Sequence, residues 1–189
     1  MTDIIEFETS RLRLRQWRDQ DFKAFAKMNA DAKVMEYYPS IITSEQSDEL
    51  ADKIQERIKE NGWGFWALEL KSTNTFIGFT GLNEPSYDLP VTPCIEIGWR
   101  LARKHWGNGY VTEAARKCLD VAFESLKLST VYSFTSIQNK KSEAVMQRLN
   151  MLNLEQNFEH PIIPIGNPLR EHVLYKITKL EWSNAPPEE

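Results

Sequence analysis

Cysteine and glycine are scarce in this chain, which has two cysteines and eight glycines in 189 residues. Cys94 and Cys118 lack the close spacing of a zinc site and lie among apolar neighbours. We therefore expect two buried free thiols rather than a disulfide or a nucleophile, and we expect no metal site. Free thiols are typical of a reducing compartment, so the expected location is cytoplasmic.

Long apolar runs and basic clusters are also missing. No segment approaches the ~20 apolar residues of a membrane span, and the first residues contain no apolar run long enough for a signal peptide. The net charge is -4, and no block of basic residues occurs, so we expect neither a membrane nor nucleic acid as a partner. The composition, 41% hydrophobic and 26% charged, is typical of a globular domain. We expect one domain over residues 1–182 and a short disordered tail at 183–189.

The spacing of apolar residues predicts seven strands and four helices. The strands are expected at residues 12–17, 63–70, 75–82, 94–101, 130–136, 152–159 and 170–178. The helices are expected after a cap at Asp19, between the capping box that starts at Thr43 and a stop at Gly62, from about 111 to 125, and within 139–151. This order predicts an α+β fold with a mixed central sheet of about seven strands.

Two of the eight glycines, Gly107 and Gly109, stand directly before the third predicted helix. The first turn of a helix leaves backbone N–H groups unpaired and carries partial positive charge. Glycines let that backbone approach a phosphate without a Cβ in the way, so the segment is a candidate anion site. The alternative is a tight turn in which the glycines only relieve steric strain.

The segment from Lys104 to Gly109, KHWGNG, resembles the pyrophosphate-binding turn of the GNAT superfamily of N-acetyltransferases, Q/R-x-x-G-x-G/A. Lys104 departs from the family's Gln or Arg. The following GYVTEA and the N-x-x-S helix start at Asn139 and Ser142 resemble the branch that includes the bacterial ribosomal-protein N-terminal acetyltransferases. The resemblance covers nearly the whole chain.

This resemblance implies a GNAT fold, with a sheet splayed between its fourth and fifth strands and helices on both faces. It also implies acetyl-CoA as cosubstrate, with its pyrophosphate on the amides of the glycine turn and its pantetheine arm along the end of the fourth strand. The implied cofactor-binding residues are Trp99, Leu101, Lys104, His105, Trp106, Gly107, Asn108, Gly109, Tyr110, Val111, Asn139 and Ser142.

Acetyl transfer to an amine needs a neutral amine, a stabilised carbonyl oxygen and a protonated leaving thiolate. Direct attack in a ternary complex satisfies this without a cysteine nucleophile. Glu96, on the strand that would carry the acetyl-CoA arm, is the expected base, acting through a water. Its alternative role is to be a cross-strand partner for Arg100 or another cation. Glu84 is a second candidate base or else a solvated loop acid, and the amine could also arrive already deprotonated.

The usual general acid of this family is a tyrosine in the fourth helix. Met146 stands at the aligned position, so this tyrosine is missing here. Ser142 matches a serine to which this branch assigns the role, and its hydroxyl can donate to the sulfur. Its alternative role is to begin the helix, and Asn139 could likewise be an N-cap. Asn150 replaces the glycine that often follows this helix, where a left-handed backbone is expected.

The leading candidate acceptor is the α-amine of a protein N-terminus. The alternative acceptor is a small amine, such as an antibiotic or a polyamine. The alternative functions are a non-catalytic acyl-CoA-binding sensor and a nucleotide-binding regulator. The protein is expected to be either a monomer or a homodimer. Loops 36–43 and 160–172 are candidates for acceptor recognition, with His160 and His172 either titrating there or structural. Aromatic residues expected near the acceptor, or else in the core, are Tyr37, Tyr38, Trp63, Trp66, Tyr87 and Trp106.

Overall fold

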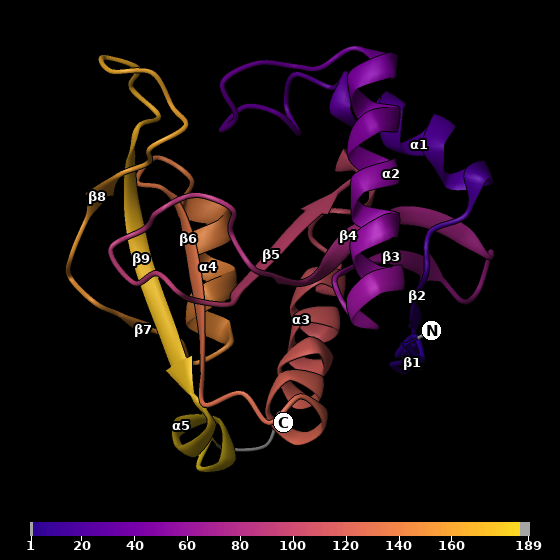
Figure 1. Cartoon of the computed structure of the whole chain (residues 1–189). Helices are drawn as coiled ribbons and strands as arrows, with labels where there is room; N and C mark the ends of the chain where they lie inside the picture. Colours follow the sequence, from indigo (N-terminus) through magenta and orange to yellow (C-terminus); the bar gives the residue numbers. More distant parts are fainter. Residues whose placement is uncertain (1, 186–189) are drawn as a thin grey trace.

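A single twisted sheet organises the computed structural model, which describes residues 2–185 (Figure 1). The strands are β1 (Phe7–Glu8), β2 (Leu12–Arg15), β3 (Phe65–Leu70), β4 (Thr75–Asn83), β5 (Glu96–Leu101), β6 (Thr130–Ser136), β7 (Leu152–Asn153), β8 (Phe158–Glu159) and β9 (Glu171–Thr178). The helices are α1 (Asp19–Asn29), α2 (Ser44–Asn61), α3 (Tyr110–Asp120), α4 (Lys140–Arg148) and α5 (Lys179–Ser183). Short helical turns cover Arg103–His105 and, as a π-helical end to α3, Val121–Ser125.

The sheet splays between β5 and β6, as the resemblance implied. These two strands are parallel and, within residues 2–185, are paired in register at one position, Glu96 opposite Tyr132. By contrast, β4 pairs with β5 along the whole of β5, and β6 pairs with β9 along its whole length. Beyond Ile97, whose carbonyl accepts from the Ser133 hydroxyl at 3.0 Å, the edge of β5 is open. Backbone groups on that edge are available to a ligand.

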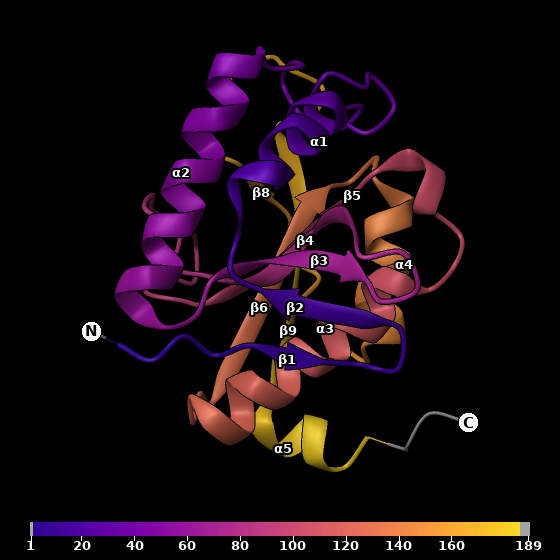
Figure 2. The same ribbon diagram turned by 90° about the vertical axis from the view of Figure 1, so that its right-hand side faces the viewer.

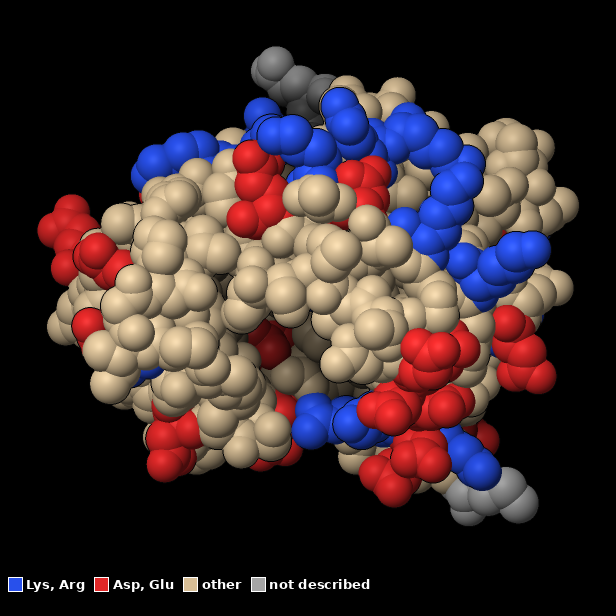
Figure 3. Space-filling view, turned by 90° about the horizontal axis from the view of Figure 1, so that it is seen from above, with Lys and Arg blue, Asp and Glu red and all other residues tan. Residues whose placement is uncertain are grey.

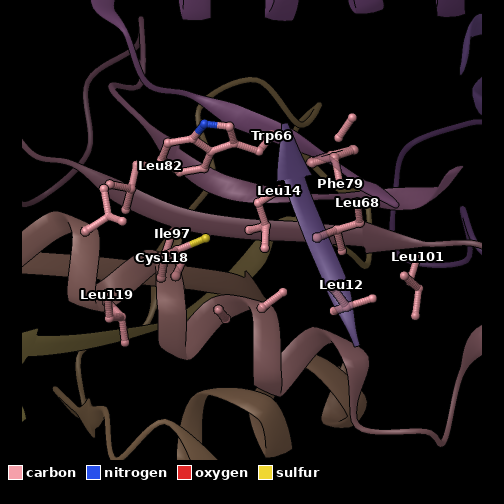
Figure 4. Close-up of a cluster of buried hydrophobic side chains, with 14 of the residues drawn as sticks. Leu12, Leu14, Trp66, Leu68, Phe79, Leu82, Ile97, Leu101, Cys118 and Leu119 are labelled. Atoms are coloured by element: carbon pink, nitrogen blue, oxygen red, sulfur yellow. The ribbon is translucent and has the colours of Figure 1, made fainter. Parts of the chain in front are cut away.

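Helices cover both faces of the sheet (Figure 2). On one face Leu12, Leu14 and Ile97 lie beside Cys118 and Leu119 of α3, and all five are buried (Figure 4). Burial of such apolar side chains is the main source of the domain's stability.

On the opposite face, α1 packs on β4 through three aromatic rings. The ring of Trp17 lies 4.8 Å from that of Phe25 and 5.2 Å from that of Phe76. On the first face, α3 packs against β2, β4 and β5, which places its first turn at the edge where the sheet opens.

The helix ends follow the predicted chemistry with one exception. Thr43 and Gln46 form the capping box of α2, and Gly62 ends this helix in the left-handed region at φ 80°. Asn150 is also left-handed, at φ 57°, after α4. The prediction for the first helix was wrong in detail, because Asp19 is its first residue and Asp21 supplies the cap, accepting from the Arg18 amide at 2.9 Å.

Several predicted boundaries were also wrong. The sheet has nine strands rather than about seven, because β1 adds an edge and the predicted strand 152–159 is broken into β7 and β8. The left-handed Glu155, at φ 54°, interrupts that strand. The helix expected to continue to residue 125 changes to π-helical geometry at Val121. The expected tail begins inside α5, and its last four residues lie outside the described part of the chain.

Residues 2–185 include no helix long and apolar enough to cross a membrane. Both cysteines are free and buried. Burial raises the pKa of Cys94 to about 11 and raises that of Cys118 well above its ordinary value, so both thiols stay protonated at neutral pH. In the same part of the chain, no cluster of three or more His, Cys, Asp or Glu side chains has the proximity needed for a metal ion.

Candidate active site

The glycine turn has the geometry of an open anion cradle. Gly107 and Gly109 both have φ +76°, in the left-handed region that favours glycine. A Cβ placed on Gly107 would meet nothing within 4 Å, so this backbone faces open space. The first hydrogen bond of α3 runs from the Glu113 amide to the Gly109 carbonyl at 3.0 Å. The amides of residues 110–112 are therefore left over from helix bonding, as at any helix start.

A second observation favours an anion at this turn. The Nε2 atom of His105 is shielded from solvent and, among residues 2–185, has no hydrogen-bond partner. Burial, and secondarily the charge of Lys104, lowers the pKa of His105, so the ring is neutral at neutral pH. A neutral ring can supply one N–H donor to a bound anion in addition to the backbone amides.

Arg11 and Glu113 brace this turn from the N-terminal side. Arg11 donates to the Asn108 carbonyl at 3.0 Å and to Glu113 at 2.6 Å, and its guanidinium lies 4.6 Å from the ring centre of Tyr110. Burial acts to raise the pKa of Glu113, but hydrogen bonds from Thr9 and from the Arg11 amide and side chain lower it overall. Sequence reasoning missed this brace. The available signal was Glu113 itself, an acid in the first turn of a helix.

The glycine turn, the end of β5 and the start of α4 line one cavity of about 990 Å³. Of the predicted cofactor-binding residues, the cavity is lined by Trp99, Leu101, His105, Trp106, Gly107, Gly109, Tyr110, Val111, Asn139 and Ser142. Lys104 and Asn108 are exposed and do not line it. The Asn108 side chain instead donates to the carbonyls of His105 and Trp106, at 3.2 and 3.0 Å, which stabilises the turn.

Ser142 lies where the cavity meets the open edge of β5. Its hydroxyl oxygen accepts from the Trp99 indole at 3.3 Å and from the Asn139 amide at 3.0 Å. Both of its lone pairs are thereby used, which leaves the hydroxyl proton free to be donated elsewhere. The Asn139 side chain also caps α4 by accepting from the Ser142 amide at 3.2 Å. The predicted structural role of Asn139 is therefore present, and Met146 is buried.

Glu96 and Glu84 have different surroundings. A side-chain amide of Asn83 donates to Glu96 at 2.7 Å, and no ion pair joins Glu96 to Arg100, so the alternative pairing with Arg100 was wrong. Burial raises the pKa of Glu96 to about 7, although the Asn83 hydrogen bond acts in the opposite direction. Glu84 is exposed to solvent. With its pKa raised to about 7, Glu96 is suited to accept a proton near neutral pH.

A second cavity, of about 820 Å³, lies between α2 and the sheet, beside Asn83 and Glu84. Arg100 lines both cavities. Seen from above, the molecule is hollowed near the centre of this face, and acidic atoms are visible deep inside the hollow (Figure 3). The loop between α1 and α2 and the loop between β8 and β9 both rise at this end of the sheet (Figure 1).

The aromatic residues expected near an acceptor separate into four groups. Tyr37, Tyr38 and Trp106 line the first cavity and Trp63 lines the second, whereas Trp66 is fully buried and belongs to the core. Tyr87 lies 5.0 Å from the ring of His160, in a cluster with His172 and two phenylalanines. Burial lowers the pKa of His160 to about 4, which favours its structural role.

The comparisons with known proteins agree with this fold. The acetyltransferase (GNAT) domain family matches residues 11–152, so the chain belongs to the GNAT acetyltransferases. YkkB of Bacillus subtilis, an uncharacterised protein, is 34% identical to it over 144 residues, which are 76% of this chain and 83% of YkkB. The crystal structure of a GNAT-family acetyltransferase from Bacillus anthracis has a TM-score of 0.78 at 24% identity, covering 94% of this chain and all of that one.

Two further similar proteins differ in the acceptor that their names state. One is a putative ribosomal N-acetyltransferase of Bacillus subtilis, YdaF, which is 33% identical over 87 residues, or 46% of each chain. The other is a spermidine N-acetyltransferase chimera built from a Vibrio cholerae enzyme, with a TM-score of 0.72 at 22% identity, covering 93% of this chain and all of that one. The names of these similar proteins therefore do not point to one common acceptor.

Proposed function

We propose that this protein transfers an acetyl group from acetyl-CoA to a primary amine, with the α-amine of a peptide N-terminus as the leading acceptor. The observation that carries the proposal is the left-handed turn at Gly107 and Gly109, which opens on the same cavity as Ser142 and the free edge of β5. The turn would hold the pyrophosphate, and the open strand edge would pair with the pantetheine arm. The orphaned Nε2 of His105 gives the phosphates a further donor.

The reaction would proceed by direct attack of the amine on the thioester carbonyl. The C–N bond forms as the C–S bond breaks, and the amine proton passes to Glu96 through a water. The hydroxyl of Ser142 donates to the departing sulfur, since its oxygen is already held by Trp99 and Asn139. Neither cysteine takes part, because both thiols stay protonated at neutral pH.

Calorimetric titration with acetyl-CoA, CoA and ADP in parallel tests the binding half of this proposal. We expect micromolar binding of acetyl-CoA and CoA and much weaker binding of ADP, because ADP lacks the pantetheine arm that would pair with β5. Equal binding of all three ligands would favour the nucleotide-binding alternative. An absence of binding would refute the proposed function.

Ser142→Ala tests the assigned acid. We expect turnover of acetyl-CoA to fall about tenfold to 150-fold with little change in acetyl-CoA affinity, since a single hydrogen bond to a developing charge contributes ~1.5–3 kcal/mol. Ser142→Cys is the matched variant, because it keeps a weak donor at the same position. Thiol release at a saturating amine concentration measures the effect. Unchanged turnover in Ser142→Ala would leave Ser142 as a helix-start residue.

A sensor that binds acyl-CoA without turnover is the second candidate, and the buried Met146 at the position of the usual tyrosine favours it. A small amine remains the alternative acceptor, since the named acceptors of similar proteins include spermidine. Thiol release on addition of a peptide or a polyamine separates these possibilities. Release with neither amine, in a protein that binds acetyl-CoA, would support the sensor.

A further inference from the structure

Within the described residues 2–185, Arg100 is a cation that lies between the two cavities without a counterion. Its side chain leaves β5 on the same face as Glu96, and it lines both cavities. Its Nη1 atom donates to the Asn29 side chain at 2.6 Å. Among residues 2–185 no carboxylate pairs with this guanidinium, and its Nε atom is shielded from solvent without any acceptor. A cation held away from water without a counterion lowers the stability of the folded protein, unless a bound ligand supplies the negative charge.

The guanidinium is held in one orientation by its neighbours. Asn29 is fully buried and donates in turn to Ser47 of α2 at 2.8 Å. The ring of Tyr38 covers one face of the guanidinium at 4.1 Å, and the ring of Phe79 lies 5.5 Å away. Two helices and two aromatic rings therefore orient a planar cation. The protein covers its Nε atom, so the oxygens of a carboxylate would reach the guanidinium at its Nη groups.

Glu96 and Arg100 are four residues apart on one strand, so their Cα atoms are separated by about 13 Å. We propose that the acceptor is a primary amine bearing a carboxylate at a comparable distance, with the amine directed to Glu96 and the carboxylate bound by Arg100. This inference rests on the proposed function and specifies its acceptor. Its two possible sources are a peptide with an acidic side chain near its N-terminus and a small amino acid with a terminal amine.

The net charge of -4 favours a basic acceptor over long range, but it does not decide the local site. Exposed charges act over a Debye length of about 8 Å at physiological salt, whereas Arg100 would touch the ligand directly. A polyamine would place a second cation next to an unpaired guanidinium. Beside Arg100 this disfavours a spermidine-like acceptor, whereas the glutamates that line the second cavity, Glu56, Glu60 and Glu84, would attract one.

The test uses pairs of acceptors that differ only in one carboxylate. The peptide amides Ala-Ala-Glu and Ala-Ala-Gln form one pair, and 6-aminohexanoate and its carboxamide form the other. For each pair we would measure kcat/KM by thiol release, and also calorimetric binding to the CoA-loaded protein. We would use the wild-type chain, Arg100→Gln, Arg100→Lys and the control Lys27→Gln, which removes an exposed charge from α1.

We expect the wild type and Lys27→Gln to prefer the carboxylate member of at least one pair by about thirtyfold, because charge-assisted hydrogen bonds are the strong ones. Arg100→Gln should lose this preference, and Arg100→Lys should keep part of it because it retains the charge without the fork. The pair that responds identifies the source, peptide or small molecule.

Equal binding of carboxylate and carboxamide by the wild type, or an unchanged preference in Arg100→Gln, would overturn the assignment of Arg100. Either result leaves the proposed function standing if acetyl-CoA binds and an amine is acetylated. If no amine is acetylated, the calorimetric arm still decides whether Arg100 binds a carboxylate, and the sensor becomes the favoured function.

Discussion

Gly107→Val is expected to weaken acetyl-CoA binding by a factor of about a hundred or more while the protein still folds. No atom lies within 4 Å of a Cβ at this position, so the branched side chain would enter the open space of the cradle rather than clash with the core. That space is where the phosphates would meet the backbone amides of the α3 start. Calorimetric titration of the variant with acetyl-CoA measures the loss directly.

Gly166→Val is a closely matched control. Gly166 has φ +83°, and a Cβ there would also meet nothing within 4 Å, but the residue lies in the loop between β8 and β9. Both variants carry the strain of a left-handed non-glycine residue, roughly 1–2 kcal/mol, and both should lose a few degrees of melting temperature. We expect only Gly107→Val to lose acetyl-CoA affinity. Normal affinity in Gly107→Val, or an equal loss in both variants, would refute the anion cradle.

Much of the fold was predictable because its signals are local. The capping box at Thr43, the stop at Gly62 and the two strands expected at residues 63–70 and 75–82 each depend on neighbours in the chain, and the structure contains all of them, with β3 beginning at Phe65. The splay between β5 and β6 was predicted by the resemblance alone. Residues 152–159 show the limit of local reasoning, since the left-handed Glu155 divides them into two short strands that both pair with β9.

Which residues meet at the candidate site was partly predictable, because some of them are close in sequence and others were assigned through the resemblance. Gly107, Gly109 and Tyr110 are adjacent in sequence, so a strand, a turn and a helix place them together. Asn139 and Ser142 were assigned through the resemblance, and the structure brings them to the same cavity. Their roles in binding and catalysis remain predictions for the experiments above.

What could not be predicted depends on contacts between distant segments. Arg11 reaches Asn108 and Glu113 across about a hundred residues of chain, and Arg100 finds Asn29 from another part of the fold. In the sequence analysis, an ion pair between Arg100 and Glu96, which share a face of one strand, was the alternative to a base role for Glu96. The structure corrects this, because the strand rise keeps residues four apart too distant for contact, and a helix supplies the nearer partner.

Glu96→Gln is expected to lower kcat by a factor of about a hundred to a thousand, as loss of a general base typically does. Glutamine retains an oxygen that can accept from Asn83, so the local hydrogen bond should survive. In the wild type, activity should rise with pH through about 7 and then level off, because burial raises the pKa of Glu96 to about 7 and only the ionised form accepts a proton. The variant should lose this inflection.

Glu96→Gln should also raise the stability of the protein above pH 7, although it lowers kcat. A carboxyl whose pKa is about 7 when folded and 4.5 ordinarily holds its proton longer in the folded state, so its contribution to stability decreases as pH rises from about 4.5 to about 7. Above pH 7 the wild type keeps a costly buried carboxylate, and Glu96→Gln should be more stable by roughly 1–3 kcal/mol. Thermal melts of both proteins at pH 5 and pH 8 measure this difference.

Glu84→Gln decides between the two candidate bases in the same assay. Since Glu84 is exposed, we expect this variant to keep its turnover and its pH profile within a few-fold. A large loss in Glu84→Gln with normal turnover in Glu96→Gln would transfer the role to the loop acid. If both variants keep the inflection in their pH profiles, neither carboxylate is the base and the amine arrives deprotonated. Glu96 would then be a buried acid that lowers stability and has no role in catalysis.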